Sequence, residues 1–325
     1  MNSYNSRLQV SASHILSRGG EYLRRLCESV RAEYRLDPIG IAPAPRGYYG
    51  ETWRLECEDR GYFLKLDYTT HKDVYARSFL IIDHLWQNGI NFISHIVKTV
   101  DGRLFTNFEG AVLGIFDWID GTSIETDATK PPEYDMLARV YAVPVNDLDI
   151  PRAKFSDESA ERFFTLWEAC DRGGAVDKVL EGHRGLLEQR ARKLRRFACE
   201  CKNDTSHFYL THGDAGGNLL VNGDDYRIID WDDALLAPPE RDAWVMCCSP
   251  WARTAFNEAL RRHRVEYALR PERLAYYCYH MFFFYLTAFL EGFTKTEPER
   301  EISEYFDGWI EERIHWADGV ESEVP

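Results

Sequence analysis

Oxygen-bearing side chains gather at the two ends of one short segment of this chain. Asp214 and Asn218 stand at its start, and Asp230 follows two apolar runs, at residues 219–221 and 226–229. An Asn-Gly turn separates the runs, a pattern that predicts a β-hairpin. Because a hairpin folds its ends together, we expect the three side chains on one side of it. Such hard oxygen donors suit Mg²⁺ holding phosphates, and one acid can serve a reacting hydroxyl.

The same segment resembles the aminoglycoside phosphotransferase family, whose relatives include choline kinase and protein kinases. The resemblance rests on His-x-Asp at 212–214, Asn218 and Ile-Ile-Asp-Trp-Asp at 228–232. The tail Ala-Pro-Pro-Glu-Arg-Asp at 237–242 looks most like the spectinomycin phosphotransferase branch. The resemblance implies an α+β, bilobal, protein-kinase-like fold. Its N-lobe would have an antiparallel sheet and a helix, and its larger C-lobe would be mainly helical.

By that resemblance, Asp214 is the catalytic base, and Asn218 and Asp230 are the metal ligands. The family usually has four residues between the base and the Asn, but only Ala-Gly-Gly intervenes here. The glycines allow a shorter loop to reach the same metal; the alternative is that Asn218 is misplaced. A surface hairpin with acidic ends is the plainer interpretation. His212 is interpreted as a structural brace of the loop rather than an acid–base residue.

A turn-rich loop with Gly47 and Gly50 precedes two predicted strands, at 53–58 and 62–66. Glycine lets backbone amides approach a phosphate closely, although an ordinary turn would use the same residues. Lys65 stands between two leucines, and strand alternation sends it to the opposite face. A lysine in an apolar strand needs a partner or a purpose. The resemblance implies that it holds the α- and β-phosphates; a solvent-facing lysine is the alternative.

The family places an acid on the next helix, predicted at 71–88, to pair with this lysine. That helix has no glutamate, and Asp73 is the nearest acid. The apolar strand at 111–119 resembles the hinge, where the Asp117 carbonyl and the Ile119 amide would bind adenine. We therefore expect a nucleotide-binding N-lobe at 1–119 and a catalytic, acceptor-binding C-lobe at 120–325. Other predictions are a hairpin of 92–99 with 103–108, two helices within 155–202, and a closing helix at 302–316.

Two groups of residues are candidates for binding the acceptor. The aromatic helix at 273–293 contains Tyr277 and His280, which would line a pocket if they are not simply core residues. Asp232, Asp233 and Glu240 would bind ammonium groups of a substrate; a solvated acidic surface is the alternative.

The 325 residues carry a formal net charge of −14, with a pI near 5.2. So acidic a chain is a poor nucleic-acid binder. Its eight cysteines include no CxxC pair, which favours reduced thiols in the cytoplasm. The start of the chain lacks an apolar signal segment, and the longest apolar stretch, 281–290, is too short to span a bilayer.

Together these features predict a cytoplasmic enzyme, monomeric or homodimeric, with no nucleic-acid or membrane partner. It would transfer the γ-phosphoryl group of ATP, with Mg²⁺, to a hydroxyl of a small molecule; GTP stays open. The expected acceptor is an aminoglycoside or aminocyclitol antibiotic, spectinomycin first, and the consequence is resistance. The alternatives are a kinase of choline, homoserine or a sugar, and a pseudokinase that binds nucleotide without turnover.

Overall fold

The computed structural model describes residues 18–44, 50–68, 72–124, 126–292, 294 and 296–320. The chain divides into two compact units, here called unit 1 and unit 2. Unit 1 comprises Met1–Thr126, Val143–Ile150 and Gly217–Ala234, and unit 2 comprises Asp127–Ala142, Pro151–Gly216 and Leu235–Pro325. The first unit contains an antiparallel sheet and the second is mainly helical, so the α+β fold class is confirmed.

Unit 1 is built on a six-stranded antiparallel sheet in the order β1-β2-β3-β6-β4, with β5 also paired to β6. The strands are β1 (Gly40–Pro43), β2 (Glu51–Glu56), β3 (Gly61–Asp67), β4 (Ile96–Val97), β5 (Thr106–Phe108) and β6 (Ala111–Asp117). The predicted β2–β3 hairpin is confirmed. The predicted hairpin of 92–99 with 103–108 is wrong, because β4 and β5 each pair with β6 instead. β6 is apolar and buried along almost its whole length, so pairing with it buries more surface than pairing two short strands together.

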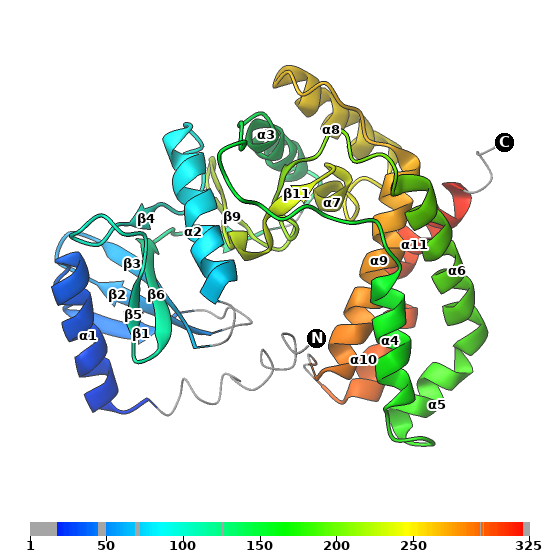
Figure 1. The fold of residues 1–325 in the computed structure, drawn as a ribbon, viewed down its shortest axis with the longest axis horizontal. Helices are drawn as coiled ribbons and strands as arrows, with labels where there is room; N and C mark the ends of the chain where they lie inside the picture. The colour runs from blue at the N-terminus through cyan, green and yellow to red at the C-terminus, as the bar shows by residue number, and fades with distance from the viewer. Residues whose placement is uncertain are drawn as a thin grey trace. The chain divides into compact units, whose positions relative to one another are not determined.

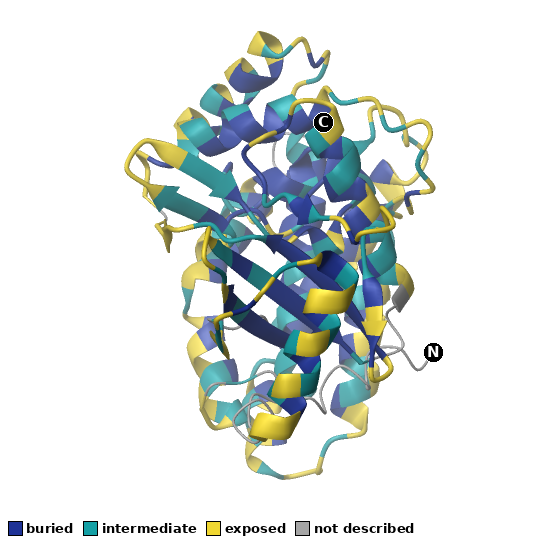
Figure 2. Ribbon diagram, turned by 90° about the vertical axis from the view of Figure 1, so that its left-hand side faces the viewer, coloured by how far each residue is buried: buried dark blue, intermediate teal, exposed yellow. Residues whose placement is uncertain are grey.

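Two helices cover the sheet, one on each face (Figure 1). α1 (Gly20–Tyr34) buries side chains at four-residue spacing, and these pack with alternate residues of β2, β3 and β6, among them Leu64 and Leu66. α2 (Lys72–Gln87) packs on the other face, where Phe79 lies 5.4 Å from the ring of Phe116. Figure 2 shows the sheet buried beneath α1, whose outward face is exposed. Lys65 therefore faces α2, as strand alternation predicts.

Gly50 directly precedes β2 in a conformation that requires glycine. Its φ is +72°, and a Cβ there would meet the Leu66 carbonyl oxygen at 2.2 Å. The close approach of the loop's end to β3 therefore depends on the absence of a side chain. Gly47 lies outside the described residues.

The central hairpin is confirmed. β9 (Leu219–Asn222) pairs antiparallel with β10 (Asp225–Ile228), and β7 (Thr122–Ser123) extends this sheet on the side of β9. The 3-10 helix η3 (Trp231–Asp233) follows β10. The amide of Ile228 donates to the carbonyl of Phe92, which ties the hairpin to the segment after α2.

Unit 2 consists of helices around α9 (Pro271–Leu290), together with the short antiparallel pair β8 (Tyr209–Thr211) and β11 (Leu235–Ala237). The other helices are α3 (Lys130–Tyr141), α4 (Glu158–Glu168), α5 (Ala175–Gly182), α6 (Arg184–Cys201), α7 (Glu240–Ala243), α8 (Pro250–Arg262), α10 (Pro298–Phe306) and α11 (Trp309–Val320). α9 packs against α4, α6, α7, α10 and α11. This enclosure explains why its sequence is apolar on nearly every side.

Two helix predictions in unit 2 are wrong in number. Residues 155–202 form three helices, because the chain turns at His183, whose ring stacks on Phe306. The predicted closing helix at 302–316 is two helices, which Asp307 and Gly308 separate. A Cβ at Gly308 would stand 3.0 Å from the Glu304 carbonyl. Within the described residues, no helix combines the length and the apolarity needed to cross a membrane.

Candidate functional site

Lys65, on β3, forms two ion pairs within unit 1. Its side chain is 10% exposed, and its Nζ lies 3.1 Å from Asp230 Oδ1 and forms a second ion pair with Asp232. The Nζ also stands 4.7 Å from the ring centroid of Tyr75 on α2. Burial alone would lower the pKa of Lys65, but the two carboxylates outweigh it and hold this pKa well above its usual value. The lysine is therefore a fixed cation.

Asp230 and Asp232 reach Lys65 because the chain turns sharply after β10. Asp230 has a φ of +64° and precedes η3, so its backbone is left-handed. A non-glycine residue in this region is uncommon and is found at functional sites. The Asp230 side chain is 42% exposed, whereas that of Asp232 is 20% exposed. Burial raises the pKa of Asp232 to about 6, while the charge of Lys65 opposes the rise.

Asn218 is brought beside Asp230 by the hairpin. The Ile229 amide donates to the Asn218 carbonyl at 3.0 Å, so these two ends of the hairpin are hydrogen-bonded neighbours. The described residues include no group of three or more His, Cys, Asp or Glu arranged for a metal ion. An amide oxygen and one carboxylate nevertheless fit Mg²⁺, which takes few protein ligands and fills its shell with water and phosphate oxygens.

Residues 212–216, the first part of the predicted catalytic loop, belong to unit 2, where hydrogen bonds to Asp242 hold them. The amides of His212 and Gly213 donate to the two Asp242 carboxylate oxygens, at 3.0 and 2.5 Å. The hydroxyl of Tyr141, at the end of α3, donates to the same carboxylate at 2.9 Å. We call these three hydrogen bonds to Asp242 the Asp242 bracket. Because Asp242 and Tyr141 are both buried, the bracket fixes the backbone that leads to Asp214.

His212 has the structural role that the sequence suggests. Its side chain is buried, and its Nδ1 accepts the Asp214 amide hydrogen at 3.2 Å. Gly213 has a φ of +94°, and a Cβ there would overlap the guanidinium of Arg241 at 2.2 Å. The loop thus turns where only glycine fits. The Asp214 side chain is exposed at the end of this turn.

The expected partner of Lys65 on α2 is wrong. Asp73 is exposed in the first turn of that helix. Within the described residues, the carboxylates that pair with Lys65 come from Asp230 and Asp232. On α2, Tyr75 presents its ring to the lysine instead of an acid. The sequence offered only a weak signal for this exchange, which is that the helix lacks a glutamate.

The proposed hinge residues lie at the end of β6. The Asp117 amide donates to the His95 carbonyl, and the Asp117 carbonyl accepts from Ser94 Oγ, both at 2.9 Å. That carbonyl has a second lone pair for another donor. Ile119, two residues further on, is half-buried. Their contact with adenine stays a prediction.

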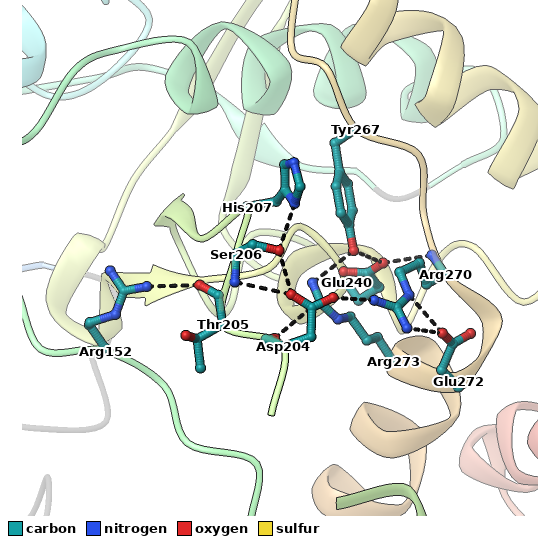
Figure 3. A network of polar contacts seen from close by, with 10 residues as sticks. All are labelled: Arg152, Asp204, Thr205, Ser206, His207, Glu240, Tyr267, Arg270, Glu272 and Arg273. Atoms are coloured by element: carbon teal, nitrogen blue, oxygen red, sulfur yellow. Dashed lines mark hydrogen bonds and ion pairs between the residues drawn. The ribbon is translucent and has the colours of Figure 1, made fainter. Parts of the chain in front are cut away.

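Glu240 is not an acceptor contact, because its side chain is fully buried. Figure 3 shows it in a polar network in which its Oε1 accepts from the Tyr267 hydroxyl at 2.8 Å and the Arg270 amide at 2.6 Å. Burial raises the pKa of Glu240 to about 7. Asp232, another expected acceptor contact, forms an ion pair with Lys65 and is not part of an exposed acidic surface.

The remaining acceptor candidates stay predictions. Asp233 is exposed at the end of η3 in unit 1. Tyr277 and His280 lie on α9 in unit 2, where Tyr277 is buried and His280 is half-buried. Burial and the charge of Arg241 lower the pKa of His280 to about 4, so the ring is neutral near pH 7.

Comparison with known proteins places this fold. No curated protein sequence matches the chain. A crystal structure of spectinomycin phosphotransferase with ADP and spectinomycin has a TM-score of 0.70 at 19% identity, covering 90% of this chain and 98% of that one. An aminoglycoside phosphotransferase from Alicyclobacillus acidocaldarius gives 0.62 at 13%, covering 87% and 92%. Choline kinase from Cryptosporidium parvum gives 0.53 at 12%, covering 87% and 90%. At these identities the likeness shows the fold.

The sequence profile of the phosphotransferase enzyme family matches residues 40–277. This range contains Lys65 with its partners Asp230 and Asp232, here called the Lys65 cluster, and the loop held by Asp242. The chain therefore belongs to the phosphotransferase enzyme family, as a small-molecule phosphotransferase with a hydroxyl group as its acceptor.

Proposed function

We propose that this protein transfers the γ-phosphoryl group of ATP to a hydroxyl of an aminoglycoside or aminocyclitol antibiotic, with a spectinomycin-like molecule as the first choice. The observation that carries the proposal is the ion pair between Lys65 and Asp230. It joins the strand lysine expected to hold the inner phosphates to the carboxylate expected to hold the metal. The acceptor class is suggested by the spectinomycin phosphotransferase structure, which is similar over most of both chains.

In this mechanism, Lys65 binds the α- and β-phosphates, and Asn218 with Asp230 holds Mg²⁺, which neutralises charge on the phosphates when it is bound. Asp214 accepts the proton of the acceptor hydroxyl. Only three residues separate Asp214 from Asn218 in the sequence. A span of four residues keeps their Cα atoms within about 14 Å of each other. The bracket from Asp242 limits the positions that Asp214 explores, as phosphoryl transfer requires positioning.

A metabolite kinase is the second candidate, favoured by the similarity to choline kinase. A nucleotide-binding pseudokinase is the third, favoured by the short Asp214–Asn218 spacing. All three candidate functions use the Lys65 cluster to bind nucleotide. They differ in the acceptor or in whether phosphoryl transfer occurs.

The test is acceptor-dependent release of ADP, measured against a panel of aminocyclitols, aminoglycosides, choline, homoserine and sugars. Turnover with a drug of the first class, together with reduced drug sensitivity of cells that produce the protein, supports the proposal. Turnover only with a metabolite replaces it with the second candidate. A rise in melting temperature with ADP and Mg²⁺ but no turnover identifies the pseudokinase.

Asp214→Asn tests the base directly. Loss of a general base costs about 10²-fold or more in kcat, and we expect the KM for ATP to change little. Asp224→Asn removes the same charge from the exposed hairpin turn and serves as the control. Unchanged kcat in Asp214→Asn rules out this residue as the base.

A further inference from the structure

The helix that faces Lys65 does not supply its counter-charge. Of the two acids on α2, Asp73 is exposed, and Asp83 pairs with Lys98 at 2.9 Å. The α2 residue that reaches Lys65 is Tyr75, through its ring. A buried lysine without a carboxylate on its neighbouring helix must be held by another element, because an unpaired charge in that position is costly.

That element is η3, which carries Asp232 to the lysine. Trp231 is 1% exposed and its indole Nε1 donates to the Ile228 carbonyl at 3.3 Å, so the turn is anchored to the end of β10. Asp232 hydrogen-bonds Lys65 through Oδ2. Its side chain is half as exposed as that of Asp230, at 20% against 42%. The two acids on this turn thus differ in environment: one is enclosed beside the lysine, and the other is open to solvent.

We propose that Asp232 is a positioning residue that takes the place of the missing helix acid and holds the Lys65 ammonium where it meets the nucleotide's phosphates. This role rests on the proposed nucleotide contact of Lys65. Asp230 is assigned to the metal, since its side chain is the more exposed of the two. Asp-Trp-Asp at 230–232 then divides two tasks between two carboxylates, a metal ligand and a lysine anchor.

The competing role for Asp232 is that of a second metal ligand, since Mg²⁺ is often held by two carboxylates. The two roles differ in what happens without metal. A lysine anchor affects nucleotide binding in the presence of a chelator, whereas a metal ligand affects it only when Mg²⁺ is present. They also differ in their coupling to Lys65, which a double-mutant cycle measures.

The experiment measures ATP binding to the full chain by calorimetry, once in excess EDTA and once with Mg²⁺, for wild type, Asp232→Asn, Lys65→Ala and the double variant. We expect Asp232→Asn to weaken metal-free ATP binding about 5-fold, corresponding to about 1 kcal/mol. The same substitution in the Lys65→Ala background should change the affinity less than about 2-fold, because its effect acts through the lysine. Asp232→Glu should restore at least half of the lost affinity. Asp232→Ser, which also removes the charge, replaces Asp232→Asn if that variant does not fold.

Asp224→Asn is the charge-matched control, since it removes one carboxylate from the same unit at an exposed position. Unchanged or tighter metal-free binding in Asp232→Asn overturns the inference, as does a full effect of the substitution without Lys65. A defect seen only with Mg²⁺ assigns Asp232 to the metal instead. If the wild-type protein binds no ATP either in EDTA or with Mg²⁺, the proposed function fails as well. This result distinguishes failure of the proposed function from failure of the inference about Asp232.

Discussion

At the scale of single residues, this protein buries several charges and satisfies most of them with charged or hydrogen-bonding partners. Lys65 has two carboxylates, and Asp242 has two backbone amides and a hydroxyl. Glu240 differs, because only its Oε1 is used, while its buried Oε2 finds no partner in the part of the chain that the structure describes. A buried carboxylate that lacks donors favours its protonated form.

This arrangement predicts a pH-dependent stability. The pKa of Glu240 is raised from 4.5 to about 7 by burial. Between these values the unfolded chain has released this proton and the folded chain retains it, so the free energy of unfolding falls as pH rises from 4.5 to about 7. Below 4.5 both states are protonated, and the group has no effect.

Glu240→Gln removes the titration and retains an oxygen for Tyr267 and Arg270. Relative to wild type, we expect the variant to gain stability between pH 4.5 and 7. A raised pKa contributes about 1.4 kcal/mol per unit, which gives on the order of 3 kcal/mol in all. Denaturant unfolding of both proteins at a series of pH values measures this difference. A constant difference across that interval contradicts the raised pKa.

At the scale of elements, the predicted catalytic loop depends on helices that are distant in sequence. α3 contributes Tyr141 and α7 contributes Asp242, and both act on the loop that follows β8. Burial and the charge of Asp242 raise the pKa of Tyr141 well above its usual value, so its hydroxyl remains a donor. The position of Asp214 is therefore set by packing among α3, α7 and the loop within unit 2, rather than by the loop alone.

Tyr141→Phe removes only the hydroxyl of this bracket. Loss of a hydrogen bond to a charged group costs about 1.5–3 kcal/mol of stability. Because Asp242 then holds the loop less firmly, we also expect kcat to fall about 3- to 10-fold, a loss of about 1 kcal/mol in transition-state stabilisation, with the KM for ATP unchanged. Unfolding experiments and steady-state kinetics measure the two effects.

Tyr276→Phe is the matched control for this prediction. Its hydroxyl is also buried, and it hydrogen-bonds the backbone of Ser156 at 3.1 Å rather than Asp242. We expect it to lower stability and leave kcat as in wild type. Equal losses of kcat in the two variants would show that the Tyr141 hydroxyl has only a general structural effect.

At the scale of the whole molecule, the dominant property is the net charge of −14. Such a charge attracts cations and repels anions over distances set by the ionic strength. The screening length falls from about 30 Å at 0.01 M to about 8 Å at physiological salt. A cationic acceptor should therefore associate with the protein faster at low salt.

We expect kcat/KM for a cationic aminocyclitol to fall several-fold when salt is raised from about 0.01 M to about 0.15 M. The same ratio for an uncharged sugar acceptor should remain within about 2-fold, because it lacks the long-range attraction. Initial rates at subsaturating acceptor and fixed Mg²⁺ and ATP measure this directly. Identical salt dependence for the two acceptors argues against charge as a determinant of acceptor choice.

Local patterns determined several parts of this protein without the structure. The hairpin at 219–228 follows from an Asn-Gly turn between apolar runs, and Lys65 faces away from its leucine neighbours because strand alternation has a period of two. Helix positions followed from apolar spacing. These predictions succeeded because each depends on residues that are close together along the chain. The candidate roles of Asp214 and Asn218 came from the family's motif and remain predictions.

Only the tertiary structure decided which strands pair with β6, which acids hold Lys65, and that Glu240 is buried. Asp232 lies 167 positions from Lys65 in the sequence, and the residues that bond Glu240 stand 27 and 30 positions away. Burial and charge pairing depend on which distant segments pack together, and no local period encodes that choice. The local sequence pattern therefore determines which helix, strand or loop carries each functional side chain. Long-range packing determines which side chains pair with one another.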